Sequence, residues 1–328
     1  MTRGKKLGLG LLIAGLVLVA LEGGLRLAGV APAYTPDIAG WRLPANLQDH
    51  TMQPANEPHH FTINTNDDGL RTRVRREKPG GVFRVAVMGD STAFGWGVDD
   101  GQDLPSQMER TLRPRSRKRI EMMNAAQPGY STSQLSVLFH ETVASYQPDV
   151  VLFFPPQHDH TPAAVSDWEL MQGTQNLRVR LAQSSRIYGL LWNALGGQRG
   201  PDQAEGSLDS TGLLTVQRTN DDERAEALDG IQDALAAWDG QLVMGLMPFY
   251  PDLHHGPEQP GDDSPAVPWI RDYARSRGLG LVDVRHCCGP DADAMVFEFD
   301  KWHLNARGNE AVGAASGEAL ADLLFGNR

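Results

Sequence analysis

Five short apolar segments alternate with helical segments along the chain, and this alternation is the feature that most constrains the fold. Apolar runs of this length, rich in β-branched residues, are typical of buried parallel strands. Strands that alternate with helices predict a parallel sheet covered by helices on both faces. The expected strands are 83–88, 119–124, 149–154, 241–247 and 279–284, and the expected helices are 104–112, 133–146, 223–238, 265–277 and 306–324.

The chain of 328 residues shows no internal repeat and no second composition regime, so we expect one main domain at 81–328. Within it, 161–225 is interpreted as an insertion, with a helical patch at about 177–195. The preceding residues 34–80, rich in Pro, Asn and Asp, are predicted to lead from the membrane to the domain as an approach segment. A short strand is expected there at 61–64.

The amino-terminal segment 1–33 is predicted to be a signal anchor that forms one transmembrane helix. Residues Leu7–Leu21 are all apolar, and Glu22 and Arg26 lie four apart, so these two can pair as the helix continues. The basic flank before Leu7 places the amino terminus inside and the rest of the chain outside the cytoplasm. The alternative is a signal peptide cleaved near Ala31–Ala33, which would give a secreted protein. A buried helix of a soluble protein is a third interpretation.

The formal net charge of -11 argues against a nucleic-acid partner, because phosphate binding depends on clustered Lys and Arg. Two arginine-rich stretches, from Arg71 to Arg76 and from Arg110 to Arg119, lie between apolar segments. Both are therefore interpreted as solvated faces of loops or helices.

The two cysteines of the chain, Cys287 and Cys288, are neighbours, so the fold is not expected to be stapled by disulfides. A metal site formed by this pair with His286 would need two further ligands at a suitable spacing, which the sequence near them does not offer. We expect neither a metal nor another cofactor.

The first strand of the domain ends abruptly in Gly89-Asp90-Ser91. The carboxyl edge of an open α/β sheet is where ligands bind, so a serine just past this strand could stand in a cleft with its hydroxyl exposed. The alternative is an ordinary turn followed by a helix cap, since Asp and Ser both favour those places.

Polar residues follow the other expected strands too, and the loops that carry them should meet at the same edge of the sheet. They contain Gly129, the group Gln157–Asp159, and Asp300 with His303. Together with Ser91 they supply a nucleophile, hydrogen-bond donors, a base and a carboxylate that orients the base. These are the parts needed for acyl transfer through a serine ester.

In these blocks the chain resembles the SGNH/GDSL hydrolase family, over about 83–324. Gly89-Asp90-Ser91 resembles the first block of the family, with Ser91 as nucleophile. The stretch from Asn124 to Gly129 is similar to the second, in which the glycine gives a backbone N–H to the oxyanion hole. The stretch from Asp300 to His303 resembles the last, Asp-x-x-His, which supplies the base and its carboxylate. The fold class expected is a flavodoxin-like three-layer α/β/α sandwich with a five-stranded parallel sheet.

Two further stretches are compared with the family. An Asn-x-x-Gly-Leu-Arg element, Asn66 to Arg71, follows the amino-terminal anchor as in membrane-anchored bacterial members. The third block departs from the pattern, because His158 occupies the position of the asparagine of the family, whose amide donates to the oxyanion. An imidazole can also donate one hydrogen bond there, so His158, or alternatively Gln157, is expected to replace it.

Trp96 and Trp302 are expected to pack near the cleft or to line it as substrate-binding residues, since aromatic walls suit apolar acyl groups or rings. Asp159 is interpreted as a loop cap that accepts backbone N–H bonds. The remaining histidines considered, which show no partner pattern, are expected to be loop residues: His160, His254, His255 and His286.

Three functions are compatible with this pattern. The first is a membrane-anchored serine esterase that acts on a small-molecule or glycan ester. The second is an O-acyltransferase or deacetylase of a cell-surface polysaccharide, with the same triad. The third, motivated by His158, is a catalytically impaired binding protein.

Overall fold

The fold is described from a computed structural model, in which residues 2–28, 42–53, 59–163, 166–172, 185–188, 216–248, 266–288 and 292–326 are described. The chain divides into two compact units. One contains residues 1–41 and 169–214, and the other contains residues 42–168 and 215–328. Each unit is described by itself. Most of the helical patch expected at 177–195 lies outside the described residues.

The larger unit is built on a parallel sheet of five strands in the order β4-β3-β5-β8-β9. The second expected strand along the chain thus lies at one edge and the first lies beside it, which is the flavodoxin-like order. The structure confirms the predicted sheet and fold class. The strands are β3 (Val82–Met88), β4 (Arg119–Asn124), β5 (Val150–Phe153), β8 (Gln241–Leu246) and β9 (Gly280–Asp283).

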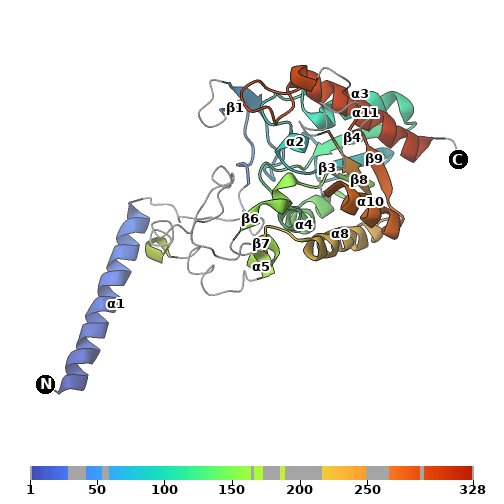
Figure 1. Ribbon diagram of the computed structural model, residues 1–328. Helices are drawn as coiled ribbons and strands as arrows, with labels where there is room; N and C mark the ends of the chain where they lie inside the picture. Colours follow the sequence, from blue (N-terminus) through green and yellow to red (C-terminus); the bar gives the residue numbers. More distant parts are fainter. Residues whose placement is uncertain are drawn as a thin grey trace. The chain divides into compact units, whose positions relative to one another are not determined.

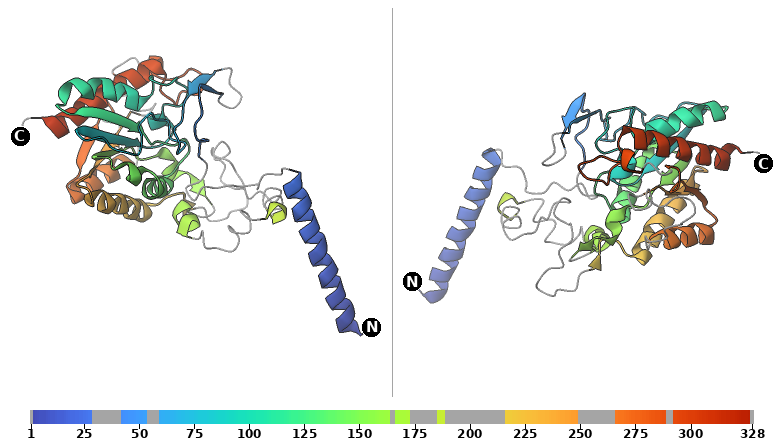
Figure 2. Two further views of the ribbon diagram at one scale, coloured as in Figure 1. Left: turned by 180° about the vertical axis from the view of Figure 1, so that it is seen from behind. Right: turned by 45° about the horizontal axis from the view of Figure 1, so that its top comes forward.

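Helices cover both faces of this sheet, as Figures 1 and 2 show. On one face lie α3 (Leu104–Leu112), which the 3₁₀ turn η1 (Arg113–Arg115) extends, and α11 (Ala306–Phe325). On the other lie α4 (Thr132–Glu141), α8 (Asp221–Ala236) and α10 (Ala266–Arg277), with the 3₁₀ turn η2 (Val143–Tyr146) after α4. The central strands are therefore buried on both sides, which explains why they read as unbroken apolar runs.

Two glycines let α11 approach α3 closely. A Cβ atom at Gly313 would lie 2.4 Å from the Cβ of Gln107, and one at Gly317 would lie 2.8 Å from the Cβ of Thr111. The close packing of α11 matters for function, because the loop that leads into this helix carries Asp300 and His303.

Residues 42–53 and 59–80 differ from a simple approach segment, because they pack into the larger unit. Strands β1 (His50–Met52) and β2 (Phe61–Ile63) form an antiparallel pair. Phe61, Ile63 and Leu70 are buried. The reason for the difference is that these few apolar side chains stand among polar ones, which hides their burial from a reading of local composition.

Part of the insertion is also described. Strands β6 (Pro162–Ala163) and β7 (Val216–Gln217) form a short antiparallel pair, so the two ends of the insertion return to one place. Helix α5 (Asp167–Gln172) follows β6. The ends of the insertion are thus tied to each other beside the third loop of the carboxyl edge.

The smaller unit contains α1 (Arg3–Leu27), which is apolar and exposed along its length. By length and composition this helix can cross a membrane, and a signal sequence meets the same criteria. The predicted pairing is present, since Nε of Arg26 lies 2.9 Å from Oε1 of Glu22.

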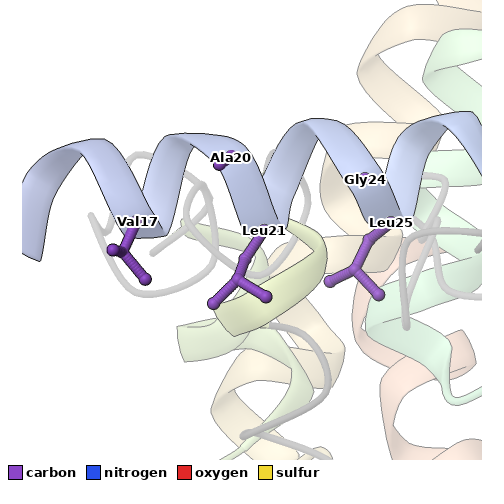
Figure 3. A pocket seen from close by; sticks show the side chains of 5 residues that line it. All are labelled: Val17, Ala20, Leu21, Gly24 and Leu25. Atoms are coloured by element: carbon purple, nitrogen blue, oxygen red, sulfur yellow. The ribbon is translucent and has the colours of Figure 1, made fainter.

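Glu22 also binds a segment far along the chain. Its carboxylate accepts hydrogen bonds from the Ser185 hydroxyl at 3.1 Å and from the backbone N–H groups of Arg186 and Ile187 at 3.0 and 3.2 Å. Beside this point an apolar hollow runs along one face of α1, lined by Val17, Ala20, Leu21, Gly24 and Leu25 (Figure 3).

Candidate active site

The turn after β3 presents Ser91 at the start of α2 (Ser91–Phe94). Gly89 is required there, because a Cβ atom would lie 2.7 Å from the Cβ of Ala93 and 3.0 Å from the carbonyl oxygen of Phe154. Asp90 caps α2 through a hydrogen bond from the Thr92 N–H at 3.0 Å. The helix-cap interpretation therefore holds for Asp90 and is compatible with a reactive role for Ser91.

The loop before α11 carries the partners of Ser91. Nε2 of His303 lies 2.8 Å from Oγ of Ser91, and Nδ1 of His303 lies 2.6 Å from Oδ2 of Asp300. Oδ1 of Asp300 accepts the backbone N–H groups of Trp302 at 2.8 Å and His303 at 3.0 Å. The structure brings together the three residues that the sequence pattern paired, although Ser91 and His303 are 212 positions apart.

The environment of Asp300 fixes the charge of this group. Burial acts to raise the pKa of Asp300, but the hydrogen bond and charge of His303 outweigh it, and the net pKa lies below the usual value. The carboxylate is thus ionised at neutral pH, and it accepts a hydrogen bond from the N–H at Nδ1 of His303. This assignment leaves Nε2 of His303 free to accept the proton of the Ser91 hydroxyl.

Backbone contacts hold the loop that carries His303. The Phe297 N–H donates to the His303 carbonyl at 3.0 Å, and Nδ2 of Asn305 donates to the carbonyls of Ala294 and Val296, both at 2.9 Å. Ala294 ends the 3₁₀ turn η6 (Ala292–Ala294). Asn305 also caps α11, since its Oδ1 accepts the Gly308 N–H at 3.1 Å. One asparagine therefore joins the loop to the helix start.

Gly129 lies in the loop that follows β4, with a φ of 75° that favours glycine. This loop stays beside the Ser91 turn, because the Gln127 N–H donates to the Gly89 carbonyl at 2.9 Å. In the described part of the chain, the N–H groups of Ser91 and Gly129 take part in no hydrogen bond. Both are therefore available to a ligand.

His158 lies on the 3₁₀ turn η3 (Gln157–His160), at the end of the third loop. The Gln157 N–H donates to Oδ2 of Asp90 at 3.2 Å, which ties this turn to the Ser91 turn. Burial lowers the pKa of His158, so its imidazole is neutral at neutral pH. No described residue forms a hydrogen bond with this ring. A neutral, unengaged imidazole can donate one hydrogen bond to a ligand.

Asp159 is fully buried, and its contacts are structural. It accepts hydrogen bonds from the Thr132 N–H at 2.7 Å, the Thr132 hydroxyl at 2.6 Å and Nε of Arg224 at 3.1 Å. The expectation that Asp159 accepts a backbone N–H bond is confirmed. Burial raises its pKa to about 6, even though the charge of Arg224 and the Thr132 donors act to lower it.

Aromatic rings lie beside the base. The centroid of the Trp96 ring is 6.4 Å from that of His303, and Trp96 also packs edge-on against Phe61. Trp302 is 44% exposed, so its ring is available to a ligand. Sequence reasoning missed His59, whose Nε2 is 2.5 Å from the Gly97 carbonyl oxygen, because nothing near His59 in the chain indicates this contact.

Arg71 also lies near the site, in an environment that differs from the one expected from the sequence. It is buried, and its guanidinium donates to the carbonyls of Phe94 at 3.2 Å, Gly95 at 2.9 Å and Val98 at 2.7 Å. The interpretation of this arginine-rich stretch as a solvated face is therefore wrong for Arg71. The physical reason is that carbonyls of the turn after α2 face the interior of the protein, where Arg71 donates to them. Nδ2 of Asn124 also donates to the Phe94 carbonyl, and the Val98 N–H donates to that of Gly95.

The remaining candidates that the structure describes make none of these contacts. Burial lowers the pKa of His160, and His286 is half-buried. His254 and His255 lie outside the described residues. Across the described ranges no group of three or more His, Cys, Asp or Glu side chains could hold a metal ion, and the Sγ atoms of Cys287 and Cys288 are 3.3 Å apart as free thiols.

Comparison with known proteins gives structural likenesses only. No protein-family model matches the sequence, and no curated protein matches it. Among solved structures, the lipase/acylhydrolase from Enterococcus faecalis matches at 15% identity over 75% of this chain and 99% of that chain, with a TM-score of 0.46. The acetyl xylan esterase AlAXEase matches at 18% identity over 73% and 100%, with a TM-score of 0.44. The psychrotrophic esterase EstA from Pseudoalteromonas sp. matches at 10% identity over 74% and 98%, with a TM-score of 0.44. The chain is thus similar in structure to proteins that are named esterases and lipases.

Proposed function

We propose that this protein is a carboxylic ester hydrolase that works through a covalent acyl-enzyme on Ser91. The observation that carries the proposal is the continuous hydrogen-bonded series from Ser91 to His303 at 2.8 Å and from His303 to Asp300 at 2.6 Å. Serine alone is a weak nucleophile, and this arrangement supplies the base and the carboxylate that activate it.

In the first half of the reaction, Oγ of Ser91 attacks the ester carbonyl carbon while its proton passes to Nε2 of His303. Asp300 stabilises the imidazolium that forms. The tetrahedral intermediate collapses when the bond to the alcohol oxygen breaks, and His303 returns the proton to this oxygen. The products are the free alcohol and an acyl group on Ser91. Water then attacks the acyl-enzyme by the same steps, which releases the acid and restores Ser91.

The negative oxygen of each tetrahedral intermediate needs hydrogen-bond donors. The N–H groups of Ser91 and Gly129 are unengaged in the described structure, and the neutral imidazole of His158 supplies a third donor. A set of fixed donors of this kind contributes several kcal/mol to the transition state, of which a single donor supplies about 3–4 kcal/mol.

The test is the Ser91→Ala variant of the full-length protein, with p-nitrophenyl acetate and butyrate as substrates and a serine-directed fluorophosphonate as label. We expect ester hydrolysis and labelling in the wild type and neither above background in the variant. The matched control is Ser145→Ala, because Ser145 is exposed and bonds only to the Thr142 carbonyl among described groups. Labelling that persists in Ser91→Ala would overturn the mechanism.

An acetyl group on a cell-surface glycan is a second candidate substrate, either removed by water or transferred to a sugar hydroxyl. The exposed ring of Trp302 supports it, because it lies two residues after Asp300 and offers an aromatic face on which a sugar ring can stack. The test compares acetate release from an acetylated polysaccharide with acetyl transfer to an added glycan. The third possibility, a binding protein with an impaired site, predicts that the fluorophosphonate fails to label Ser91.

For the location of the protein, the proposal is a single-pass membrane protein with its amino terminus inside and the enzyme unit outside the cytoplasm. The length and apolar character of α1 support this arrangement, together with the basic residues at its start. Protease added to intact cells should degrade the enzyme unit and leave the amino terminus protected.

A further inference from the structure

Arg218 lies where the insertion ends, directly after β7, and connects three parts of the larger unit. Nη1 donates to the Gly129 carbonyl at 3.0 Å, Nη2 donates to Oε1 of Gln134 at 2.8 Å, and Nε donates to Oδ2 of Asp167 at 2.9 Å. The three acceptors belong to the loop after β4, to helix α4 and to helix α5. No local pattern indicates this contact, since Arg218 is 89 positions from Gly129.

Two backbone hydrogen bonds also fix the position of Arg218 itself. The Arg218 N–H donates to the Thr161 carbonyl at 3.0 Å, and the Arg218 carbonyl accepts the Asp167 N–H at 2.6 Å. Its side chain is only 16% exposed. The guanidinium is planar and presents its donors in a rigid fork, so it can hold three acceptors in one orientation in a way that a lysine cannot.

The contact to Gly129 bears on the proposed oxyanion hole. Gly129 has positive φ, and few backbone bonds hold its loop: the Tyr130 N–H donates to the Gln127 carbonyl at 3.3 Å, which is long. The orientation of the Gly129 N–H therefore depends on what fixes the residue from its other side. Arg218 does this by binding the Gly129 carbonyl.

Arg218 also affects the third proposed donor. Burial lowers the pKa of His158, and the positive charge of Arg218 lowers it further. The carboxylates of Asp90 and Asp167 act in the opposite direction and raise this pKa. A protonated His303 would also lower it. Arg218 thus acts on both donors that lie outside the Ser91 turn.

We propose that Arg218 is a positioning residue of the oxyanion hole, through which the end of the insertion 161–225 sets the turnover of the enzyme. This inference rests on the proposed ester hydrolysis. Arg218 touches neither the nucleophile nor the base, so it acts on the transition state through Gly129 and His158. The residues at the two ends of the insertion, Asp167 and Arg218, are therefore needed for full turnover.

The experiment uses the full-length protein in detergent, with Arg218→Gln and Arg218→Lys measured on p-nitrophenyl butyrate. Because a transition-state donor is displaced, kcat should fall by about tenfold or more, while KM changes by less than about threefold. The lysine variant keeps the charge and loses the fork, so most of the loss should remain. The rate of fluorophosphonate labelling should fall in parallel, since the phosphonyl oxygen uses the same donors.

The matched control is Arg275→Gln, which removes an exposed arginine that pairs with Asp272 at 2.9 Å on helix α10. It should leave kcat unchanged. If the Arg218 variants do not fold, as judged by their thermal unfolding, Asp167→Ala replaces them. That variant removes one acceptor that orients the guanidinium, and it should also lower kcat without raising KM.

Two results would overturn the inference. One is a kcat within about twofold of wild type in folded Arg218→Gln and Arg218→Lys, or in Asp167→Ala where that variant stands in for them. The other is a loss that appears in KM alone. Failure of the proposed function gives a different outcome, because the wild type itself would then neither hydrolyse the ester nor label on Ser91.

Discussion

The side chain at position 158 determines how strongly the proposed oxyanion hole can stabilise a transition state. We predict that His158→Ala lowers kcat for p-nitrophenyl butyrate by on the order of a hundredfold, because one donor is lost. His158→Asn places an amide donor at the same position and should keep kcat within about tenfold of wild type. The two variants are compared by steady-state kinetics.

A matched control for these variants is His286→Ala, since His286 lies on the segment after β9 and makes none of the contacts described for the proposed site. It should leave kcat unchanged. Equal activity of His158→Ala and wild type would show that the imidazole takes no part in oxyanion binding.

The buried carboxyl of Asp159 gives a prediction about stability and pH. Its pKa is raised to about 6 in the folded protein, against about 3.9 in an unfolded chain, so the folded state binds the proton more tightly. The contribution of Asp159 to stability is therefore fully present below pH 4 and is lost as the pH rises through 6. Above about pH 7 it no longer changes.

The measurement is the unfolding temperature of wild type and Asp159→Asn between pH 4 and pH 8. The difference in unfolding temperature, wild type minus variant, should fall between pH 4 and about pH 7 and then become constant. A difference that does not fall over this range would mean that Arg224, at 3.1 Å, keeps the carboxylate ionised throughout it.

Single residues could be predicted from the sequence where their partners are close in the chain or follow a known pattern. Asp300 and His303 are three positions apart, and Gly89-Asp90-Ser91 follows a strand directly. Arg71 and Arg218 could not be found in this way. Their acceptors are backbone carbonyls that the fold brings near them, and an arginine that satisfies buried carbonyls has no local signature.

At the scale of elements, the turn after α2 depends on a segment that precedes the sheet. Arg71 binds three carbonyls of this turn and pairs with Asp100 at 2.8 Å. We predict that Arg71→Met lowers the free energy of unfolding by about 3–5 kcal/mol, because it removes a donor from three buried carbonyls and the cation from a partly buried carboxylate. It should also lower kcat, since Ser91 begins α2. Chemical denaturation and esterase kinetics measure the two effects.

The control for this substitution is Arg73→Met, two residues further on, where the side chain is exposed and has no partner among the described residues. Its unfolding free energy should stay within about 0.5 kcal/mol of wild type. An unfolding free energy equally close to wild type for Arg71→Met would show that water replaces the lost donors.

The sheet and its helices were predictable from the sequence because the central strands are buried on both faces and therefore read as apolar runs. The predicted helix 104–112 coincides with α3, and the predicted strand 119–124 coincides with β4. Strand β1 was not predicted, since its three residues are largely exposed and obtain their pairing only from β2. Local pattern carries no information about such a pair.

At the scale of the whole molecule, one carboxylate in the amino-terminal helix has a structural partner in the insertion. Glu22 accepts three hydrogen bonds from the segment 185–188, and a carboxylate within an apolar helix is costly without such partners. This contact can exist in the mature protein only if the helix is retained. The contact therefore gives a prediction that applies to an uncleaved anchor, since cleavage near Ala31–Ala33 would remove Glu22.

We predict that Glu22→Leu exposes the segment 185–188 to protease. In detergent micelles, trypsin should cut after Arg186 about threefold faster or more in this variant, because the segment loses the acceptor of its backbone N–H groups. Glu318→Leu, at an exposed position of α11, is the control and should be cut at the wild-type rate. The intact mass of the mature protein gives an independent check. A mature chain that begins after Ala33 would contradict the prediction, since Glu22 would then be absent from the protein that folds.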